Sequence, residues 1–285
     1  MKLDLRKALN TISDVVLNRP VPLREFDQIY MKVADMVIQA EFIARQFQDG
    51  HVVFIGDGDA ISLSIMHLRE KEVFDGAPAH ILVLDFDERI VNSINRFARD
   101  QGLEGKIESI LYNVCEPLPA ELIGSRDAFY TNPPWGASND GQSVTAFVGR
   151  GIEATKKGGS GAIVIADDHD LPWTGSVLFN TQKYLTESGF IVSEMLPELH
   201  KYHLDDAPEL TSCCMLVRDI EQKPKASPSA PLDARVLENF YGRQSPLRYR
   251  YVRDRSGLNL GKAPDGSYQL IPLEEKHEHN DYSRK

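Results

Sequence analysis

The sequence contains little cysteine and no long apolar run. Its 285 residues include three cysteines (Cys115, Cys213 and Cys214), and neither their spacing nor that of the histidines resembles a zinc site. We therefore expect free buried thiols and no bound metal. No apolar run reaches the ~20 residues that cross a bilayer, and the N-terminus lacks the apolar stretch of a signal peptide. These absences predict a soluble cytoplasmic protein that does not contact a membrane.

Positively charged residues are also fewer than negatively charged ones. Lys and Arg number 32 against 42 Asp and Glu, which gives a formal net charge of −10. Such a chain is a poor general partner for phosphate backbones, because nucleic-acid affinity comes largely from Lys and Arg. Residues 165–209 alone hold nine acidic residues against two lysines. The charge therefore favours a cationic small molecule, although five arginines within Phe240–Arg255 keep nucleic acid open as an alternative.

Short β-branched runs alternate with helical patterns from residue 51 onward, which predicts an α/β fold. A mostly parallel, seven-stranded sheet with helices on both faces is expected from this alternation. Apolar residues recur at helical spacing through residue 43, and Pro and Ser crowd residues 222–232. We therefore divide the chain into an N-terminal helical cap (1–50), a catalytic domain (51–221) and a linker with a C-terminal extension (222–285). The expected strands are His51–Ile55, Ile81–Leu84, Lys106–Leu111, Asp127–Thr131, Gly161–Ala166, Phe190–Met195 and Thr211–Val217.

Two helices in the second half of the chain have clear predicted boundaries. Val144–Lys157 is apolar at helical spacing, and Gly158-Gly159 is expected to cap its C-terminus. Leu178–Ser188 is expected to form the next helix.

The turn after the first predicted strand is rich in glycine and aspartate. Gly56-Asp57-Gly58-Asp59 lets a ligand approach the backbone closely, and the next helix offers unpaired N–H groups. It is not the GxGxxG pattern of dinucleotide-binding proteins. Its two carboxylates would repel phosphate and suit the amine or sulfonium end of an AdoMet-type cofactor. In the alternative interpretation, an Asp simply caps the following helix.

Further polar residues follow the second and third predicted strands. Asp85 ends the second strand, where an acidic residue is placed to accept both hydroxyls of a ribose. Asn113 follows the third strand, and we assign it to the cofactor side as well.

The string Asn132-Pro133-Pro134-Trp135 ends the fourth predicted strand. Its prolines fix the backbone at the edge of the sheet where open α/β folds bind ligands. The Asn132 amide and the Pro133 carbonyl could together hold an amine with its lone pair aimed at an electrophile. Trp135 could stack on a planar group or face a cation.

An acidic stretch follows the fifth predicted strand and continues to the loop before the last one. We expect one of Asp167, Asp168 or Asp170 to accept a proton and the neighbouring residues to form a wall for a polycation. His169, His200 and His203 lie in this stretch without metal-ligand spacing, and we expect surface or hydrogen-bonding roles for them. The predicted wall consists of Asp170, Trp173, Tyr202, Asp205 and Asp206.

The order of these motifs is that of class I AdoMet-dependent transferases, and the chain resembles the branched-chain polyamine synthases, which make N4-bis(aminopropyl)spermidine. The resemblance implies a class I AdoMet-transferase fold in which Gly56–Asp59 holds the methionine-derived end of decarboxylated AdoMet and Asp85 holds its ribose. It also implies that the Asn132 motif holds the accepting nitrogen and that Asp27 and Gln28 close the cofactor side. It covers roughly residues 25–220, through Phe26-Asp27-Gln28, Gly56–Asp59, Leu84–Glu88, Glu116–Pro119, Thr131–Pro134 and Phe147–Ala154.

The chain departs from the motif of that family at Asn132. Family members read Asp-Pro-Pro where this chain reads Asn132-Pro133-Pro134. An Asp there could deprotonate an ammonium group, and an Asn cannot. Asn-Pro-Pro-Trp instead resembles the motif of amino-group methyltransferases that act on adenine N6 or on glutamine amide.

Three functional hypotheses follow. The leading one is aminopropyl transfer from decarboxylated AdoMet to a polyamine, because Asp57 and Asp59 would disfavour the carboxylate of AdoMet. The second is AdoMet-dependent methylation of a nitrogen in adenine, an amide or a small amine. The third is a cofactor-binding scaffold without catalysis. A homodimer is possible in each case.

Overall fold

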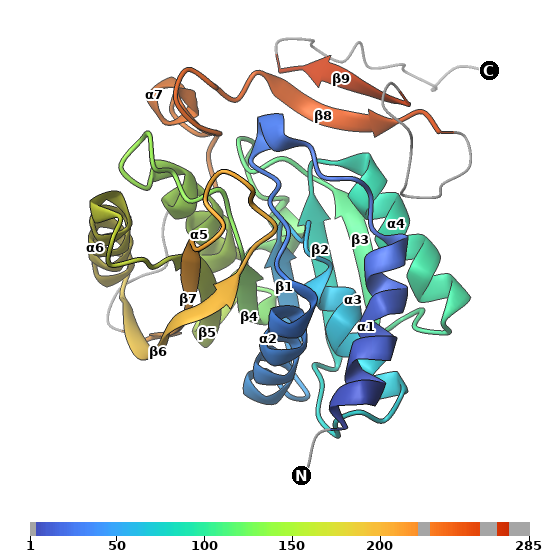
Figure 1. Cartoon of the computed structure of the whole chain (residues 1–285). Helices are drawn as coiled ribbons and strands as arrows, with labels where there is room; N and C mark the ends of the chain where they lie inside the picture. The colour runs from blue at the N-terminus through green and yellow to red at the C-terminus, as the bar shows by residue number, and fades with distance from the viewer. Residues whose placement is uncertain (1–3, 222–228, 257–266, 274–285) are drawn as a thin grey trace, which may run out of the picture.

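A central sheet between two layers of helices forms the body of the protein (Figure 1). The computed structural model describes residues 4–221, 229–256 and 267–273. Its seven-stranded sheet has the order β3-β2-β1-β4-β5-β7-β6. The pairs from β3 to β5 are parallel, and β7 is antiparallel to both of its neighbours. The predicted mostly parallel seven-stranded sheet is therefore confirmed, with its topological switch point between β1 and β4.

The strands contain the β-branched runs from which they were predicted. Both faces of the sheet are covered, so a strand such as β1 is apolar without alternation, and Val52 to Ile55 are all fully buried. The bounds are β1 His51–Ile55, β2 His80–Asp85, β3 Ile107–Leu111, β4 Arg126–Thr131, β5 Thr155–Ala166, β6 Phe190–Lys201 and β7 Thr211–Asp219.

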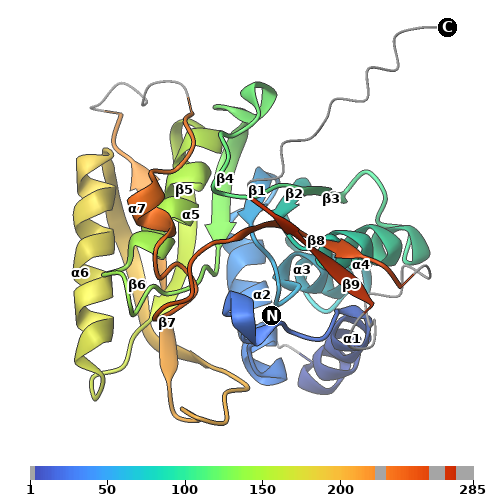
Figure 2. The same cartoon turned by 90° about the horizontal axis from the view of Figure 1, so that it is seen from above.

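Helices lie on both faces of the sheet, as Figure 2 shows from above. On one face α1 (Leu5–Asn18) and α2 (Val33–Gln46) pack with α3 (Ile61–Glu70), and α4 (Glu88–Asp100) packs on β2 and β3. On the other face α5 (Gln142–Ala154) packs on β1, β4 and β5, and α6 (Pro172–Glu187) packs on β5 and β6. The described residues also form three short helices: η1 (Arg24–Phe26), η2 (Ala120–Leu122) and α7 (Ala234–Leu237).

The predicted boundary between α5 and β5 was wrong. The helix ends at Ala154, and β5 begins at Thr155, which already pairs with Arg126 of β4. Gly159 lies inside β5, where a Cβ would come within 2.3 Å of Thr155 Cγ2, so close packing selects glycine there. The next helix, α6, also starts earlier than predicted. Pro172 lies in its first turn, where proline is tolerated because an N–H there would have no partner within the helix.

The C-terminal extension and a segment between the first two long helices both lie at the carboxyl edge of the sheet. Residues 27–32, which we call the N-terminal strap, run from η1 to α2 and are pinned to the β6–β7 connection. The Lys32 N–H donates to the Lys201 carbonyl at 2.9 Å, and the His203 N–H donates to the Tyr30 carbonyl at 2.9 Å. In the C-terminal extension, β8 (Tyr249–Asp254) and β9 (Tyr268–Pro272) form a hairpin, and β8 packs on α4.

The larger of the two hydrophobic clusters among the described residues joins the N-terminal helices, the sheet and the first part of the C-terminal extension, from Ala8 to Leu247. The predicted domain division at residues 50 and 221 stays a prediction. Most of the predicted linker, together with the residues from Glu274 onward, lies outside the described residues. Among the residues that are described, no helix is long and apolar enough to cross a membrane.

Candidate active site

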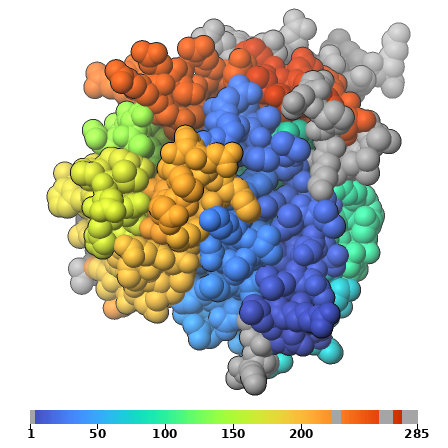
Figure 3. Space-filling view, in the orientation of Figure 1, coloured from blue at the N-terminus to red at the C-terminus, as the bar shows by residue number. Residues whose placement is uncertain are grey.

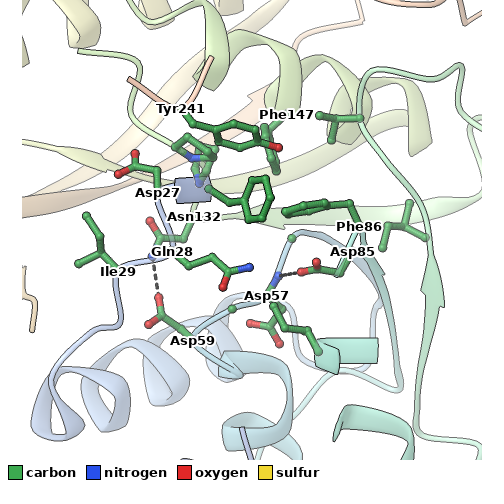
Figure 4. Close-up of a pocket in the computed structure, with 18 of the residues that line it drawn as sticks. Asp27, Gln28, Ile29, Asp57, Asp59, Asp85, Phe86, Asn132, Phe147 and Tyr241 are labelled. Atoms are coloured by element: carbon green, nitrogen blue, oxygen red, sulfur yellow. Dashed lines mark hydrogen bonds between the residues drawn. The ribbon is translucent and has the colours of Figure 1, made fainter. Parts of the chain in front are cut away.

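A pocket opens at the carboxyl ends of β1, β2 and β4, beside the switch point of the sheet (Figure 4). The turns after these strands form its floor, the N-terminal strap covers it, and Tyr241 closes it from the C-terminal extension. In Figure 3 the strap region, in blue, abuts the orange β6–β7 region across this face. Of the residues predicted from sequence, the pocket is lined by Asp27, Gln28, Gly56, Asp57, Gly58, Asp59, Asp85, Asn113, Asn132, Pro133, Trp135 and Tyr202.

The glycine turn after β1 has the backbone shape that a close ligand approach needs. Gly56 has φ +74°, and a Cβ on it would lie 3.2 Å from the Phe147 ring. The Asp57 carboxylate points at α3, where it accepts hydrogen bonds from the N–H of Ile61 at 2.9 Å and of Ser62 at 3.1 Å. Its pKa is raised well above the usual value by burial. The helix-capping interpretation therefore describes Asp57 better than a cation-binding one.

Asp85 connects the turns after β1 and β2. Its carboxylate accepts from the Asp57 N–H at 3.0 Å and from the Asp87 N–H at 2.9 Å, and the first of these bonds is drawn in Figure 4. Burial, followed by the nearby charge of Asp87, raises the pKa of Asp85 to about 7. Each oxygen keeps a second lone pair, so the carboxylate retains capacity for ribose hydroxyls.

Asn132 and Asp59 meet at the boundary between β4 and the β1 turn. The Asn132 Nδ2 donates to Asp59 Oδ2 at 2.7 Å, as Figure 4 shows, and the Met31 N–H donates to the other oxygen at 2.6 Å. Burial raises the pKa of Asp59, although the neighbouring Arg19 opposes that shift. Asn132 therefore uses an amide hydrogen, not its oxygen, to bind Asp59.

Asp27 is the carboxylate of the pocket that the protein engages least. It has φ +57° in the strap, and a backbone hydrogen bond from Trp135 is its one stabilising hydrogen-bond partner among the described residues. Desolvation raises its pKa to about 7, against the opposing charge of Arg24. A carboxylate with a pKa near neutrality can both accept and release a proton under ordinary conditions.

Two aromatic residues on the pocket wall have polar atoms without partners. The Tyr130 hydroxyl and the Trp135 Nε1 are buried and hydrogen-bond to nothing within the described part of the chain. A buried polar group without a partner is costly, so these atoms are available to a ligand. Together with the acidic residues and the open glycine turn, they fit a polar cation bearing hydroxyl or amino groups.

Gln28 and Asn113 line the pocket but are held by the protein. The Gln28 Nε2 donates to Asp87 at 3.1 Å, and its oxygen accepts from the Leu23 N–H at 2.7 Å. The Asn113 Nδ2 donates to the Arg250 carbonyl at 2.7 Å, which ties the β3 end to the C-terminal hairpin. Both side chains therefore also fix the strap and the extension around the pocket.

Sequence reasoning missed the aromatic wall of the pocket. Tyr241 lies near both Phe26 and Phe86, with ring centroids 5.4 and 6.2 Å away. Phe26 and Phe86 belong to two of the motifs named above, so their proximity to the site could have been predicted. Tyr241 follows the predicted linker, and no spacing in the sequence connects it to the pocket.

The predicted proton acceptors after β5 are not among the residues that line the pocket. Asp167 is buried, and its carboxylate accepts from the Glu198 N–H at 3.1 Å. Asp168 accepts from the Asp170 N–H at 2.9 Å in the turn that starts α6. These residues lie beyond β4, one strand away from the switch point, and they form turns there.

The predicted polycation wall is likewise not assembled around the pocket. Of its members, Tyr202 alone is among the residues that line it, whereas Asp170, Trp173, Asp205 and Asp206 are not. Asp206 is exposed and lies 3.7 Å from Arg24, across the outer side of the strap. The acidity that faces the pocket comes instead from the β1 and β2 turns and the strap.

The arginines near the C-terminus are largely paired within the chain. Arg250 forms an ion pair with Glu116, and Arg253 pairs with Glu88 at 2.9 Å. Arg255 Nε donates to Gln269 at 3.1 Å. These contacts attach β8 to α4 and to the segment after β3, and they join Arg255 to β9. They weaken the case for a free basic strip that binds nucleic acid.

The sheet order and the pocket at its switch point define a class I AdoMet-transferase fold, as predicted. The chain belongs to the branched-chain polyamine synthase A C-terminal domain family, whose model matches residues 7–244. This family assignment agrees with the resemblance read from the motifs.

Curated relatives from three organisms carry the name N(4)-bis(aminopropyl)spermidine synthase. The protein of Thermococcus kodakarensis is 32% identical over 53% of this chain and 40% of its own length. The protein of Thermus thermophilus is 27% identical over 65% of this chain and 50% of its own length. The chain therefore spans about half or less of the curated relatives it matches.

Solved structures agree with the fold. The branched-chain polyamine synthase of Thermus thermophilus, in complex with N4-aminopropylspermidine and 5'-methylthioadenosine, superposes with a TM-score of 0.69 at 20% identity. The match covers 85% of this chain and 71% of that one. A putative RNA methyltransferase from Pyrococcus horikoshii gives a TM-score of 0.55 at 15% identity, over 75% of this chain and 98% of that one.

Proposed function

We propose that this protein transfers an aminopropyl group from decarboxylated AdoMet to an amine nitrogen of a polyamine. The observation that carries the proposal is the charge of the pocket lining. Four aspartates line it, Asp27, Asp57, Asp59 and Asp85, whereas none of the lining residues is Lys, Arg or His. Such a wall offers no cationic partner to the carboxylate that distinguishes AdoMet from its decarboxylated form. Burial raises the pKa of these aspartates, and a bound ammonium group would favour their ionised form.

The family supports the same reaction. Its curated members named above are synthases of a branched polyamine, and the Thermus enzyme was crystallised with a polyamine and methylthioadenosine. Decarboxylated AdoMet would supply a propyl carbon activated by its sulfonium. The Gly56–Asp59 turn and Asp85 would hold this donor, and Asn132 with the Pro133 carbonyl would hold the accepting nitrogen.

The chemical step is an in-line displacement that positioning accelerates. The amine nitrogen forms a bond to the propyl carbon while the bond from that carbon to sulfur breaks, and the electron pair stays on the sulfur of methylthioadenosine. The nitrogen is then an ammonium and must lose a proton. Asn132 cannot accept it.

We assign the proton to Asp27. Asp57, Asp59 and Asp85 each have both carboxylate oxygens engaged by protein donors. Asp27 has the Trp135 backbone N–H alone, and its pKa of about 7 suits proton transfer near neutral pH. This role replaces the one predicted for the aspartates after β5.

N-methyl transfer from AdoMet is the second candidate, and the Asn132-Pro133-Pro134-Trp135 motif favours it. The two candidates leave different products, so one assay separates them. The full chain is incubated with spermidine and either donor, and the products are identified by mass spectrometry. Methylthioadenosine and an aminopropylated amine are expected. S-adenosylhomocysteine with a methylated amine would overturn the proposal, and no turnover with either donor would favour the inactive scaffold.

Calorimetry provides a second, independent measurement. Decarboxylated AdoMet should bind more tightly than AdoMet, and the reverse order would contradict the argument from pocket charge. The homodimer stays a prediction.

A further inference from the structure

A chain of buried side chains runs from the core to the accepting end of the pocket. Its members are Gln39 of α2, His200 of β6, Ser212 of β7 and Tyr202 just after β6. Their exposed fractions are 0% for the first three and 2% for Tyr202. Tyr202 lines the pocket, whereas the other three lie behind it.

The register of the sheet brings these side chains together. His200 and Ser212 are directly paired across the antiparallel β6–β7 ladder, so their side chains share a face. Tyr202 lies two residues beyond His200 and therefore returns to that face. The His200 Nδ1 is 3.0 Å from Ser212 Oγ, which is 2.8 Å from the Tyr202 hydroxyl. The His200 Nε2 is 2.8 Å from Gln39 Oε1.

The direction of every hydrogen bond in this series of side chains follows from the orientation of Gln39. The Gln39 Nε2 is used on the Cys214 sulfur at 3.4 Å, so Gln39 presents its amide oxygen to His200. That oxygen can only accept, and the His200 Nε2 must therefore carry the ring proton. Burial lowers the pKa of His200 to about 3, so the ring is neutral and Nδ1 is an acceptor.

The direction then passes outward to the pocket. Ser212 has one hydrogen and donates it to His200 Nδ1. The Ser212 oxygen is left as the acceptor, so the Tyr202 hydroxyl donates inward to it. Tyr202 consequently turns oxygen lone pairs, and no hydrogen, toward the pocket.

The Asn132 side chain interacts with the Tyr202 hydroxyl oxygen, and burial holds the pKa of that hydroxyl well above its usual value. Because the Tyr202 hydrogen is directed to Ser212, Asn132 is the donor in this interaction. The other hydrogen of its amide is donated to Asp59. With both amide hydrogens directed to protein oxygens, Asn132 Oδ1 is the atom that remains for a ligand.

We propose that His200 and Ser212 are positioning residues that act through Tyr202 to hold the Asn132 amide with its oxygen facing the accepting nitrogen. The site therefore selects an acceptor that donates an N–H and keeps its lone pair free for attack, which describes a neutral primary or secondary amine. This inference rests on the proposed function for its kinetic consequence. The direction of the chain can be measured without any turnover.

The first test is spectroscopic. Histidine ¹⁵N correlation spectra of the full chain at neutral pH, with His200 identified by the signal missing in His200→Gln, report the ring tautomer. A neutral ring protonated on Nε2 is expected. A proton on Nδ1, or a charged ring, would reverse the bond directions and overturn the inference, whatever the enzyme turns over.

The second test is kinetic and compares variants that are expected to lose similar amounts of stability. Ser212→Ala breaks the chain behind the pocket, and Tyr202→Phe removes its last hydroxyl. Thr155→Val is the control, because Thr155 is fully buried and donates to the Gly151 carbonyl at 2.7 Å away from the pocket. With a hydrogen bond worth ~1 kcal/mol, Ser212→Ala and Tyr202→Phe should each lower kcat about fivefold with little change in KM.

The two losses should not add, because both variants cut one chain. The double variant Ser212→Ala, Tyr202→Phe should match Tyr202→Phe, and Ser212→Thr should recover most of the lost kcat. Thr155→Val should keep the wild-type kcat even if its thermal stability falls as far as that of Ser212→Ala. Equal kcat in Ser212→Ala and the control would overturn the inference, whereas absence of turnover in the wild type would count against the proposed function.

Discussion

The rings of Phe86 and Tyr241 lie 6.2 Å apart between centroids and within 28° of parallel, although 155 positions separate them in the chain. Phe86 follows the β2 acid that faces the donor, and Tyr241 comes from the C-terminal extension. The extension therefore supplies part of the pocket wall, and what it contributes can be measured.

Replacing Tyr241 with Ala should weaken donor binding. The variant loses an aromatic face that contacts Phe26 and Phe86, and such contacts are each worth ~1 kcal/mol. We expect the Kd of methylthioadenosine, measured by calorimetry, to rise about tenfold. Phe179→Ala is the control, because Phe179 is 67% exposed on α6. Unchanged binding in Tyr241→Ala would show that the extension does not belong to the site.

Replacing Asp27 with Asn should lower activity and raise stability, and both effects should depend on pH. The pKa of this carboxyl is about 7 in the folded chain against 3.8 for the free group. A raised pKa in an acid means that the stability it contributes is fully present below the lower value and is lost as pH rises through the upper one. The amide has no such loss.

Two measurements follow for that variant. Its Tm should exceed that of the wild type at about pH 8.5 and approach it at about pH 5. Turnover of the wild type should fall as pH drops below about 7, when Asp27 becomes protonated, and Asp27→Asn should lose about 100-fold in kcat together with that pH dependence. A variant that kept the acid limb of the profile would assign the proton to another group.

Replacing Gly56 with Ala should separate backbone strain from loss of the site. Gly56 has φ +74° and Gly102 has φ +67°, and a Cβ at Gly102 meets nothing within 4 Å. Both Gly→Ala variants should lose ~1–2 kcal/mol of unfolding free energy in denaturant titrations, because both force alanine into the left-handed region. Gly56→Ala alone should also lose methylthioadenosine binding, since its methyl group enters the turn beside Phe147. Normal binding by Gly56→Ala would contradict close ligand approach at that turn.

Replacing Arg89 with Met should be strongly destabilising. The Arg89 guanidinium pairs with Asp87 at 2.6 Å, and the two side chains are 1% and 0% exposed. Leaving Asp87 buried without its partner should cost ~3–5 kcal/mol in unfolding free energy. Arg99→Met, on the exposed side of the same helix, should cost little and serves as the control. Similar losses of unfolding free energy in the two variants would show that the buried ion pair contributes no more to stability than the exposed arginine.

Much of the site could be predicted from sequence because one rule of parallel sheets was sufficient. Strands that run the same way end at the same edge, so Asp59, Asp85 and Asn132 had to meet once their strands were recognised. The same rule misled for Asp167. It identifies the edge but not the distance along it, and β5 lies one strand beyond β4, away from the switch point.

Other features depend on contacts that local sequence does not encode. The glycine pair after α5 is typical of a helix end, but here the pairing of Thr155 with Arg126 moves that end upstream. His200 has no neighbour in sequence that hints at Ser212 or Gln39, since strand register and the packing of α2 bring them together. Tyr241 is in the pocket because the extension folds back, and only the tertiary structure contains that information.

The hairpin that ends the described chain has a consequence for synthesis on the ribosome. The central sheet has all its strands once Asp219 has been made, so folding of the core can begin at that point. The pocket still lacks Tyr241 and the Arg250 carbonyl that holds Asn113. A nascent chain therefore builds its scaffold first and gains a finished binding site only when the C-terminal extension has emerged as well.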